Sequence, residues 1–264
     1  MKKKYKIGCL VMSRMTSSRL PGKALLKIKG KPALQHIIER AKLVSVADLV
    51  ILATSTDKKD DVLERLAKKN KIEVFRGSLV DVLDRFLGAA HKFSLDYFAV
   101  YTADNLFCDP GLINLGLRQI VKDKLDFINT PDDLVCGGSA YCISTKALER
   151  LCELKSNENT ELYQDYFLTA RGLKIADLKV ADPIFHNTNA RVTLDYPEDL
   201  KFFRKVFERM DIKTNDIPLK KILQFLKQNP EIAQINLFRH ADWFQKQEHI
   251  REVLKKNKFK NSNS

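Results

Sequence analysis

Residues 5–23 read YKIGCLVMSRMTSSRLPGK, a short apolar run that passes directly into a polar and basic loop. The run from Tyr5 to Met12 is compact and rich in residues that favour β-structure, so we predict a buried strand there. Lysines precede the run, as in a signal peptide, but the apolar stretch is short and Ser13-Arg14 follows it without a small-residue cleavage site. We therefore expect a cytoplasmic protein whose first structural element is a strand.

Strand-like and helix-like segments alternate outward from this point. Further strands are predicted at 49–53, 72–75 and 98–102, each followed by apolar residues at helical spacing. The helices should begin at Pro32, at Asp57 or Lys58, after a cap at Ser78, and at Asp109-Pro110. Repeated strand–helix units of this kind predict an α/β protein with a mostly parallel sheet covered by helices. In such sheets, ligands bind beyond the carboxyl ends of the strands.

The pattern is looser after residue 125. Strands are predicted at 125–129, 139–143, 173–180 and 191–194, and helices at 144–154, 159–171 and 197–210. Two more helices, separated by Asn229-Pro230, are expected from Thr214 onward. We predict one main domain at 1–212 and a basic helical C-terminal extension at 213–264.

Composition narrows the class of protein. Of the 264 residues, 44% are hydrophobic and 30% are charged, as is usual for a globular chain. No apolar run approaches the ~20 residues of a membrane-spanning helix. The five cysteines are scattered, without a C-x-x-C pair or a histidine at zinc-finger spacing, so we expect buried, reduced thiols. The net charge of +13 is compatible with an anionic partner, but we favour a solvated basic helix face as the explanation of the terminal lysines.

The loop that follows the first strand is the segment most informative about chemistry. It carries three cations, Arg14, Arg19 and Lys23, interleaved with hydroxyl side chains and a Pro-Gly turn. Backbone N–H groups, arginine forks and a lysine charge suit the oxygens of a triphosphate, and the alternative is a solvated basic loop. Neither Gly-Lys pair in the chain is followed by the Ser or Thr of a P-loop, and no G-x-G-x-x-G occurs. A kinase or dehydrogenase therefore lacks its signature here.

Two aspartates follow apolar runs, where a magnesium ligand would have to lie. Asp104 comes just after the strand predicted at 98–102, and Asp195 directly follows residues 191–194. Mg²⁺ usually takes one or two carboxylates together with phosphate oxygens and water. The alternative for Asp195 is an N-cap before the proline that begins the next helix, and the alternative for Asp104 is an ordinary loop residue.

Several segments match the motifs of one enzyme family in consistent order between residues 6 and 210. Residues 14–23 fit R-x-x-S-x-R-L-P-G-K and residues 191–200 fit R-V-T-L-D-x-P-E-D-L, with ATS at 53–55, FRGS at 75–78, DVLDRF at 81–86 and DNLFCDP at 104–110 between them. The chain thereby resembles the cytidylyltransferases that make CMP-activated acidic sugars, and more closely their spore-coat-polysaccharide-type branch. It departs from the family at Ser13 and Thr16, where Ala and Gly are common, and at Asn105-Leu106, where Cys or Glu precedes Pro.

This resemblance implies a Rossmann-like nucleotidyltransferase fold over 1–212, often a homodimer, with Mg²⁺ as the cofactor. Matched position by position, it implies catalytic roles for Arg14, Arg19 and Lys23, and metal ligation by Asp104 and Asp195. It also implies that the nucleotide contacts Ser13, Ser17, Thr54, Ser55, Arg76 and Asp81.

The implied reaction transfers a nucleoside monophosphate from a triphosphate, first of all CTP, to a sugar for surface glycan synthesis and releases pyrophosphate. Three alternatives stay open: a guanylyltransferase acting on a sugar 1-phosphate, a non-catalytic nucleotide-binding relative, and a basic nucleic-acid or membrane-surface protein. We rank the last below the others, and so expect neither a nucleic-acid partner nor stable membrane insertion. Glu161, Tyr163 and His186 are weaker candidates for a position near the sugar.

Overall fold

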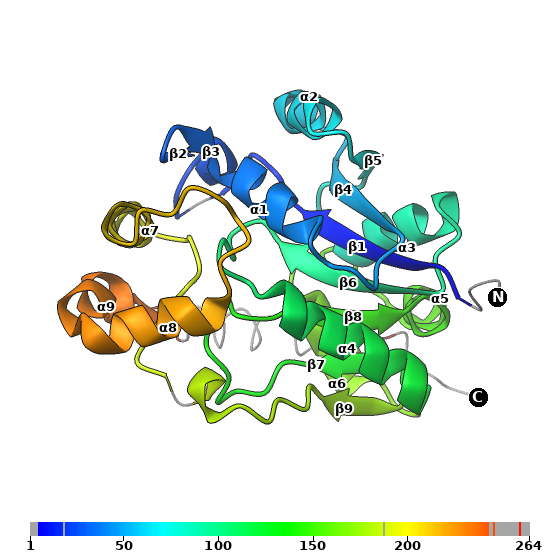
Figure 1. The fold of residues 1–264 in the computed structure, drawn as a ribbon. Coiled ribbons are helices and arrows are strands. Elements are labelled where there is room, and N and C mark those ends of the chain that lie inside the picture. Colours follow the sequence, from blue (N-terminus) through cyan, green and yellow to red (C-terminus); the bar gives the residue numbers. More distant parts are fainter. Residues whose placement is uncertain (1–4, 18, 187, 243–244, 246–258, 260–264) are drawn as a thin grey trace.

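The computed structural model describes residues 5–17, 19–186, 188–242, 245 and 259. Its main feature is a seven-stranded sheet (Figure 1), in which β8 alone runs antiparallel to its neighbours among the described strands. In spatial order the strands are β5 (Glu73–Gly77), β4 (Leu49–Ser55), β1 (Ile7–Met12), β6 (Tyr97–Thr102), β8 (Tyr141–Ser144), β7 (Phe127–Asn129) and β9 (Ile175–Asp177). The predicted α/β class and mostly parallel sheet are confirmed.

Helices cover both faces of the sheet, and each face has its own apolar cluster. One cluster includes α1 (Ala33–Ala41), α2 (Asp61–Lys69), α4 (Pro110–Asp123), α7 (Pro197–Arg209), α8 (Leu219–Gln228) and α9 (Pro230–Leu237). The other includes α3 (Val82–Lys92), α5 (Thr145–Leu154) and α6 (Tyr163–Thr169). Short elements complete the description: strands β2 (Lys27–Ile28) and β3 (Lys31–Pro32), and 3₁₀ turns η1 (Lys23–Leu25), η2 (Lys58–Asp60) and η3 (Pro183–Phe185).

Strand β1 lies at the centre of the parallel part of the sheet. It is paired in parallel with β4 on one side and with β6 on the other. Its side chains alternate between the two clusters, with Cys9 and Val11 in one and Leu10 in the other. A strand buried on both faces has no polar alternation, which is why the first residues formed a continuous apolar run in the sequence.

Some predicted elements differ from the structure. Residues 191–194 are not a strand; Arg191 makes only an isolated bridge with Cys136, because this segment crosses the end of the sheet instead of joining it. Ser78 does not cap α3: Asp81 does, accepting from the backbone N–H of Asp84 at 3.1 Å. The helix predicted at 159–171 is limited to α6, and β9 is shorter than the predicted strand at 173–180.

The helices after residue 212 are present and pack closely against the rest of the chain. Leu219 and Ile222 of α8 and Ile232 of α9 are buried in the same apolar cluster as β1 and α1. Figure 1 shows α7, α8 and α9 gathered at one end of the molecule. The domain boundary at 212/213 stays a prediction, and it divides helices that share one apolar cluster. No helix in the described part of the chain is both long and apolar enough to cross a membrane.

Candidate functional site

One lysine joins the two predicted metal-binding aspartates. Lys23 begins the 3₁₀ turn η1, and its Nζ lies 2.8 Å from Asp104 Oδ2 and 3.0 Å from Asp195 Oδ1. Both carboxylates therefore converge on one point beyond the carboxyl ends of β1 and β6. Burial by itself would lower the pKa of Lys23, but the two carboxylates outweigh burial and raise it above its ordinary value. The ammonium is charged throughout the neutral range.

Asp195 is the buried member of this cluster, with 1% of its surface exposed. Besides Lys23, it accepts from Arg19 Nη2 at 2.6 Å and from Arg191 Nη2 at 3.1 Å. Burial would raise its pKa, yet Lys23 and Arg19, with Arg191 behind them, lower it to about 2. The side chain does not cap α7: the N-cap residue is Tyr196, and both Asp195 oxygens accept from the three cations. Asp199 Oδ2 accepts the backbone N–H groups of Asp195 and Tyr196 at 2.7 and 2.8 Å. The capping alternative is thus excluded.

Backbone hydrogen bonds align the segments that carry these side chains. The N–H of Ala103 donates to the carbonyl of Met12 at 2.9 Å, which continues the β1–β6 pairing past both strand ends. The N–H of Leu194 donates to the carbonyl of Asp104 at 2.7 Å, and this bond brings residues 191–195 against the end of β6. The segment from Val192 to Leu194 therefore lies across the end of the sheet and places Asp195 beside Asp104.

The three cations of the loop separate into two groups. Arg19 and Lys23 lie at the aspartates, whereas Arg14 donates to the carbonyl of Leu79 at 3.3 Å and to Glu161 Oε1 at 2.5 Å. Arg85, also near Arg14, is 1% exposed and donates to the carbonyl of Ser78 at 2.8 Å. Burial, and then the charge of Arg14, lower the pKa of Arg85 to about 10. The second group lies between the loop and the start of α3, and its two cations face the carboxylates of Glu161 and Asp60.

Ser13 and Ser17 of the loop have structural partners. Ser13 is buried, and its N–H donates to the carbonyl of Ala53 at 3.3 Å, which extends the β1–β4 pairing. Ser17 Oγ accepts from the N–H of Leu20 at 3.3 Å and shapes the turn before Pro21. Their predicted contacts with a nucleotide stay predictions.

Thr54 and Ser55, at the end of β4, donate hydrogen bonds to the carboxylate of Asp60, which sequence reasoning missed. Asp60 is 1% exposed and accepts from Thr54 Oγ1 at 3.0 Å and from Ser55 Oγ at 2.5 Å. Its other oxygen accepts from the N–H of Met15 at 2.7 Å. Asp60 therefore ties the basic loop to β4 from inside the molecule. Nothing in the local pattern distinguished it from the neighbouring acidic residues at 57 and 61.

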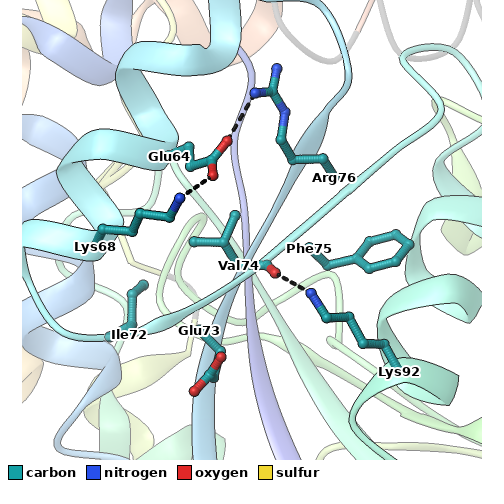
Figure 2. Close-up of a pocket in the computed structure, with 8 residues that line it drawn as sticks. All are labelled: Glu64, Lys68, Ile72, Glu73, Val74, Phe75, Arg76 and Lys92. Carbon is teal, nitrogen blue, oxygen red and sulfur yellow. Dashed lines mark hydrogen bonds and ion pairs between the residues drawn. The ribbon is translucent and has the colours of Figure 1, made fainter.

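Arg76 lies on β5, at the edge of the sheet. Its Nη1 lies 2.6 Å from Asp61 Oδ1 and 2.9 Å from Glu64 Oε2, and Nε donates to the carbonyl of Ser55 at 2.8 Å. It lines a surface hollow of about 510 Å³, and Figure 2 shows Arg76 and Lys68 both paired with Glu64. Among the lining residues Glu64 pairs with Lys68 and Arg76, and the lining does not include Lys23 or either site aspartate. In this structure Arg76 holds α2 against the sheet.

Asp81 is likewise engaged by the protein. It caps α3, forms an ion pair with Lys155, and accepts from Thr160 Oγ1 at 2.9 Å. The segment that carries Lys155 and Thr160 also carries Glu161, the partner of Arg14. One connection between α5 and α6 therefore contacts both the loop and the start of α3.

Of the weaker candidates, Tyr163 lies near the site and His186 has partners elsewhere. Tyr163 is 3% exposed, and its hydroxyl has no hydrogen-bond partner within the described ranges. Burial first, and then Tyr141 and Asp104, raise the pKa of Tyr163 well above its ordinary value. His186 instead pairs with Asp133 at 2.8 Å and with the carbonyl of Val180 at 3.0 Å.

The two aspartates fit a magnesium ion, because carboxylate oxygens are the ligands that Mg²⁺ takes. Among the described residues no group of three or more His, Cys, Asp or Glu side chains is arranged to hold a metal. Two carboxylates that converge on one cation position match the way Mg²⁺ is bound, with substrate phosphates and water as the remaining ligands. Asp104, with its side chain 24% exposed, is the more accessible of the two.

Sequence reasoning also missed the support behind Asp195. Arg191, which is fully buried, binds Asp195 and places its Nε 3.1 Å from Asp199 Oδ1. Asn236, from α9, donates to Asp199 Oδ1 at 2.8 Å. The motif at 191–200 contains Arg191, Asp195 and Asp199. Their mutual contacts depend on the turn at Tyr196-Pro197. Asn236 had no signal in the sequence.

Comparison with known proteins identifies relatives along almost the whole chain. A family model described as cytidylyltransferase matches residues 8–239. An uncharacterized protein of Methanocaldococcus jannaschii is 30% identical, over 88% of this chain and 94% of that protein. The spore coat polysaccharide biosynthesis protein SpsF of Bacillus subtilis is 26% identical, over 85% of this chain and 95% of that protein. The structure of a cytidylyltransferase from Leptospira borgpetersenii superposes with a TM-score of 0.80 at 24% identity, covering 87% of this chain and 97% of that one.

Proposed function

The chain belongs to the cytidylyltransferase family, and from this premise we propose that it transfers CMP from CTP to a sugar and releases pyrophosphate. The observation that carries the proposal is the convergence of Asp104 and Asp195 on Lys23, with Arg19 beside them. Cations and carboxylates at one sheet edge suit a triphosphate and the metal that accompanies it. The similarity to SpsF, a spore coat polysaccharide biosynthesis protein, supports a sugar as the acceptor.

The reaction needs positioning and charge neutralisation more than covalent help from the protein. A sugar oxygen attacks the α-phosphorus, the bond from the α-phosphorus to the bridging oxygen breaks, and the electron pair leaves with pyrophosphate. Arg19 and Lys23 stabilise the charge that develops on the departing oxygens. The proton of the attacking hydroxyl passes to solvent or to a carboxylate at the site.

Asp104 and Asp195 would hold Mg²⁺, which when bound supplies Lewis-acid polarisation of the phosphate oxygens. Because the pKa of Asp195 is held near 2, this carboxylate is ionised and ready to ligate at every physiological pH. Lys23 neutralises the same two carboxylates and so keeps them close together. Its long side chain allows it to follow a phosphate oxygen while still facing the aspartates.

The test is pyrophosphate release with each of the four ribonucleoside triphosphates, against a panel of keto-acid sugars and sugar 1-phosphates, with and without Mg²⁺. We expect release that requires CTP, one sugar class and the metal. Release with GTP and a sugar 1-phosphate would replace this proposal with a guanylyltransferase. A folded protein that binds CTP but releases no pyrophosphate with any sugar would be a non-catalytic relative.

A further inference from the structure

Helix α9 reaches the network that holds Asp195 from behind. Asn236 is fully buried, and its side-chain amide nitrogen donates both to the carbonyl of Arg191 at 3.0 Å and to Asp199 Oδ1 at 2.8 Å. An amide NH₂ has two donor hydrogens, and both are used here. The two acceptors therefore fix the orientation of the side chain.

Both residues that accept from Asn236 also contact Asp195, through other atoms. The Arg191 side chain donates to the Asp195 carboxylate at 3.1 Å, and Asp199 Oδ2 accepts the Asp195 backbone N–H at 2.7 Å. Arg191 Nε also lies 3.1 Å from Asp199 Oδ1, so Arg191 and Asp199 are joined to each other. Asn236 thereby connects the residues that fix the main chain and the carboxylate of Asp195.

A second residue of the C-terminal region contacts the same turn. Arg239 places Nε 3.1 Å and Nη2 2.9 Å from the two oxygens of Glu198, and its guanidinium lies 4.9 Å from the centre of the Tyr196 ring. Residues 196, 198 and 199 are therefore all held from the C-terminal side. Asn236 and Arg239 therefore both contact the turn that immediately follows Asp195.

Packing alone does not account for an asparagine at this position. Asn236 Oδ1 and Arg191 Nη1 are buried without hydrogen-bond partners among the residues described. Buried polar atoms left unpaired are costly, and an apolar residue of similar size would avoid the orphaned acceptor. An asparagine, unlike an apolar residue, can donate hydrogen bonds to Arg191 and Asp199. Those bonds orient the two residues that contact Asp195.

We infer that Asn236 is a positioning residue for Asp195, so that the C-terminal extension forms part of the metal and triphosphate site. The inference rests on the proposed function, in which Asp195 is a metal ligand. Groups that orient metal ligands from outside the first coordination sphere typically change metal affinity or activity by roughly 10–100-fold when removed. Asn236 acts through Arg191 and Asp199, so we expect an effect of roughly tenfold, at the lower end of that range.

The experiment compares Asn236→Leu with wild type in the full chain. The first readout is Mn²⁺ binding, measured by electron paramagnetic resonance of free Mn²⁺ with a non-hydrolysable CTP analogue present. The second readout is the Mg²⁺ concentration that gives half-maximal pyrophosphate release. We expect both to shift by roughly tenfold toward weaker binding in Asn236→Leu, with the melting temperature measured in parallel.

Asn229→Ala is the matched control. Asn229 lies between α8 and α9 and donates its side-chain N–H to the carbonyl of Phe225 at 2.9 Å, with no bond to Arg191 or Asp199. This variant should lower the melting temperature and leave both metal readouts at the wild-type value. If both metal readouts are equal in Asn236→Leu and wild type, the inference is wrong. Pyrophosphate release by the wild type would in that case still support the proposed function. An inactive wild type that still bound Mn²⁺ would remove the proposed reaction, and the Mn²⁺ shift would still decide the role of Asn236.

Discussion

The ammonium nitrogen of Lys23 lies 3.0 Å from the buried carboxylate of Asp195, although 172 positions separate the two residues in the chain. The same nitrogen lies 2.8 Å from Asp104. One cation thus joins the loop after β1, the end of β6 and the turn before α7. Each of these segments is held by its own backbone pairing, so the cluster is built before any ligand arrives.

Replacing Lys23 with methionine should remove most activity. The variant keeps the length of the side chain but leaves Asp104 and Asp195 without their shared cation and the departing pyrophosphate without one charge. Loss of one preorganised charge-stabilising group costs about 10²–10³ in turnover. Steady-state pyrophosphate release measures the effect, and Lys29→Met, which removes an exposed pair with Asp211, serves as the control. A kcat within threefold of wild type would exclude Lys23 from the chemistry.

The two aspartates should differ in what they contribute to stability. Asp195→Asn leaves the buried Arg191 and its neighbours with one carboxylate fewer, and breaking a buried ion pair costs about 3–5 kcal/mol. Asp104 is partly exposed, so Asp104→Asn should cost about 1 kcal/mol or less. Urea unfolding of the two variants separates these values, and both variants should lose turnover. A similar stability for both would contradict the unequal burial of the two sites.

The contribution of Asp195 to stability should depend on pH only in acid. Its pKa is about 2 in the folded protein and ~3.9 in an unfolded chain, so the folded state favours the ionised form. The stabilisation is complete above the unfolded value and disappears as the pH falls through the folded one. The difference in unfolding free energy between wild type and Asp195→Asn should therefore be constant from about pH 5 to 8 and shrink below about pH 4. Urea titrations at four pH values test this, and a difference that changed near neutrality would require another titrating group.

Replacing Arg76 with methionine should affect folding more than nucleotide binding. Its guanidinium pairs with Asp61 and Glu64 and also donates to the carbonyls of Ser55 and Asp57. Losing these bonds should lower the unfolding free energy by about 1–3 kcal/mol. The KM for CTP should stay within about threefold of wild type, because a change of that size corresponds to less than 1 kcal/mol. A large rise in KM with unchanged stability would restore the nucleotide contact that the sequence motif implies.

His186 offers a pH-dependent contact that is separate from the aspartates. Its hydrogen bond with Asp133, supported by the carbonyl of Val180, raises the pKa of His186 above its ordinary value. The charged form is therefore favoured by folding, and this contribution is complete below ~6.5 and lost as the pH rises through the folded pKa. In Asp133→Asn, NMR titration should show a lower pKa for His186. An unchanged titration curve would show that Asp133 does not interact with the ring in solution.

Much of the fold was predictable because its signals are local. A strand buried on both faces needs a continuous apolar run, as at 7–12, and Asp109-Pro110 begins a helix through its own cap and ring geometry. Residues 191–194 show the limit of this reasoning. Their apolar pattern fits a strand, but strand formation also needs a neighbouring edge, and here the segment crosses the sheet end. Likewise the sequence favours Ser78 as the cap of the helix that follows, whereas Asp81 caps it in the structure.

The sequence by itself determined the α/β class, the order of strands and helices, and the family motifs that marked the loop and the two aspartates. These properties depend on residues close together along the chain, where periodicity and turn chemistry act. Tertiary structure alone decided that Lys23 lies between Asp104 and Asp195, that Arg14 and Arg76 face other partners, and that Asn236 supports Asp195 from α9. The physical reason is that a side chain's electrostatic partners are set by which strand ends and helices the packed core brings together, and that packing involves residues far apart in sequence.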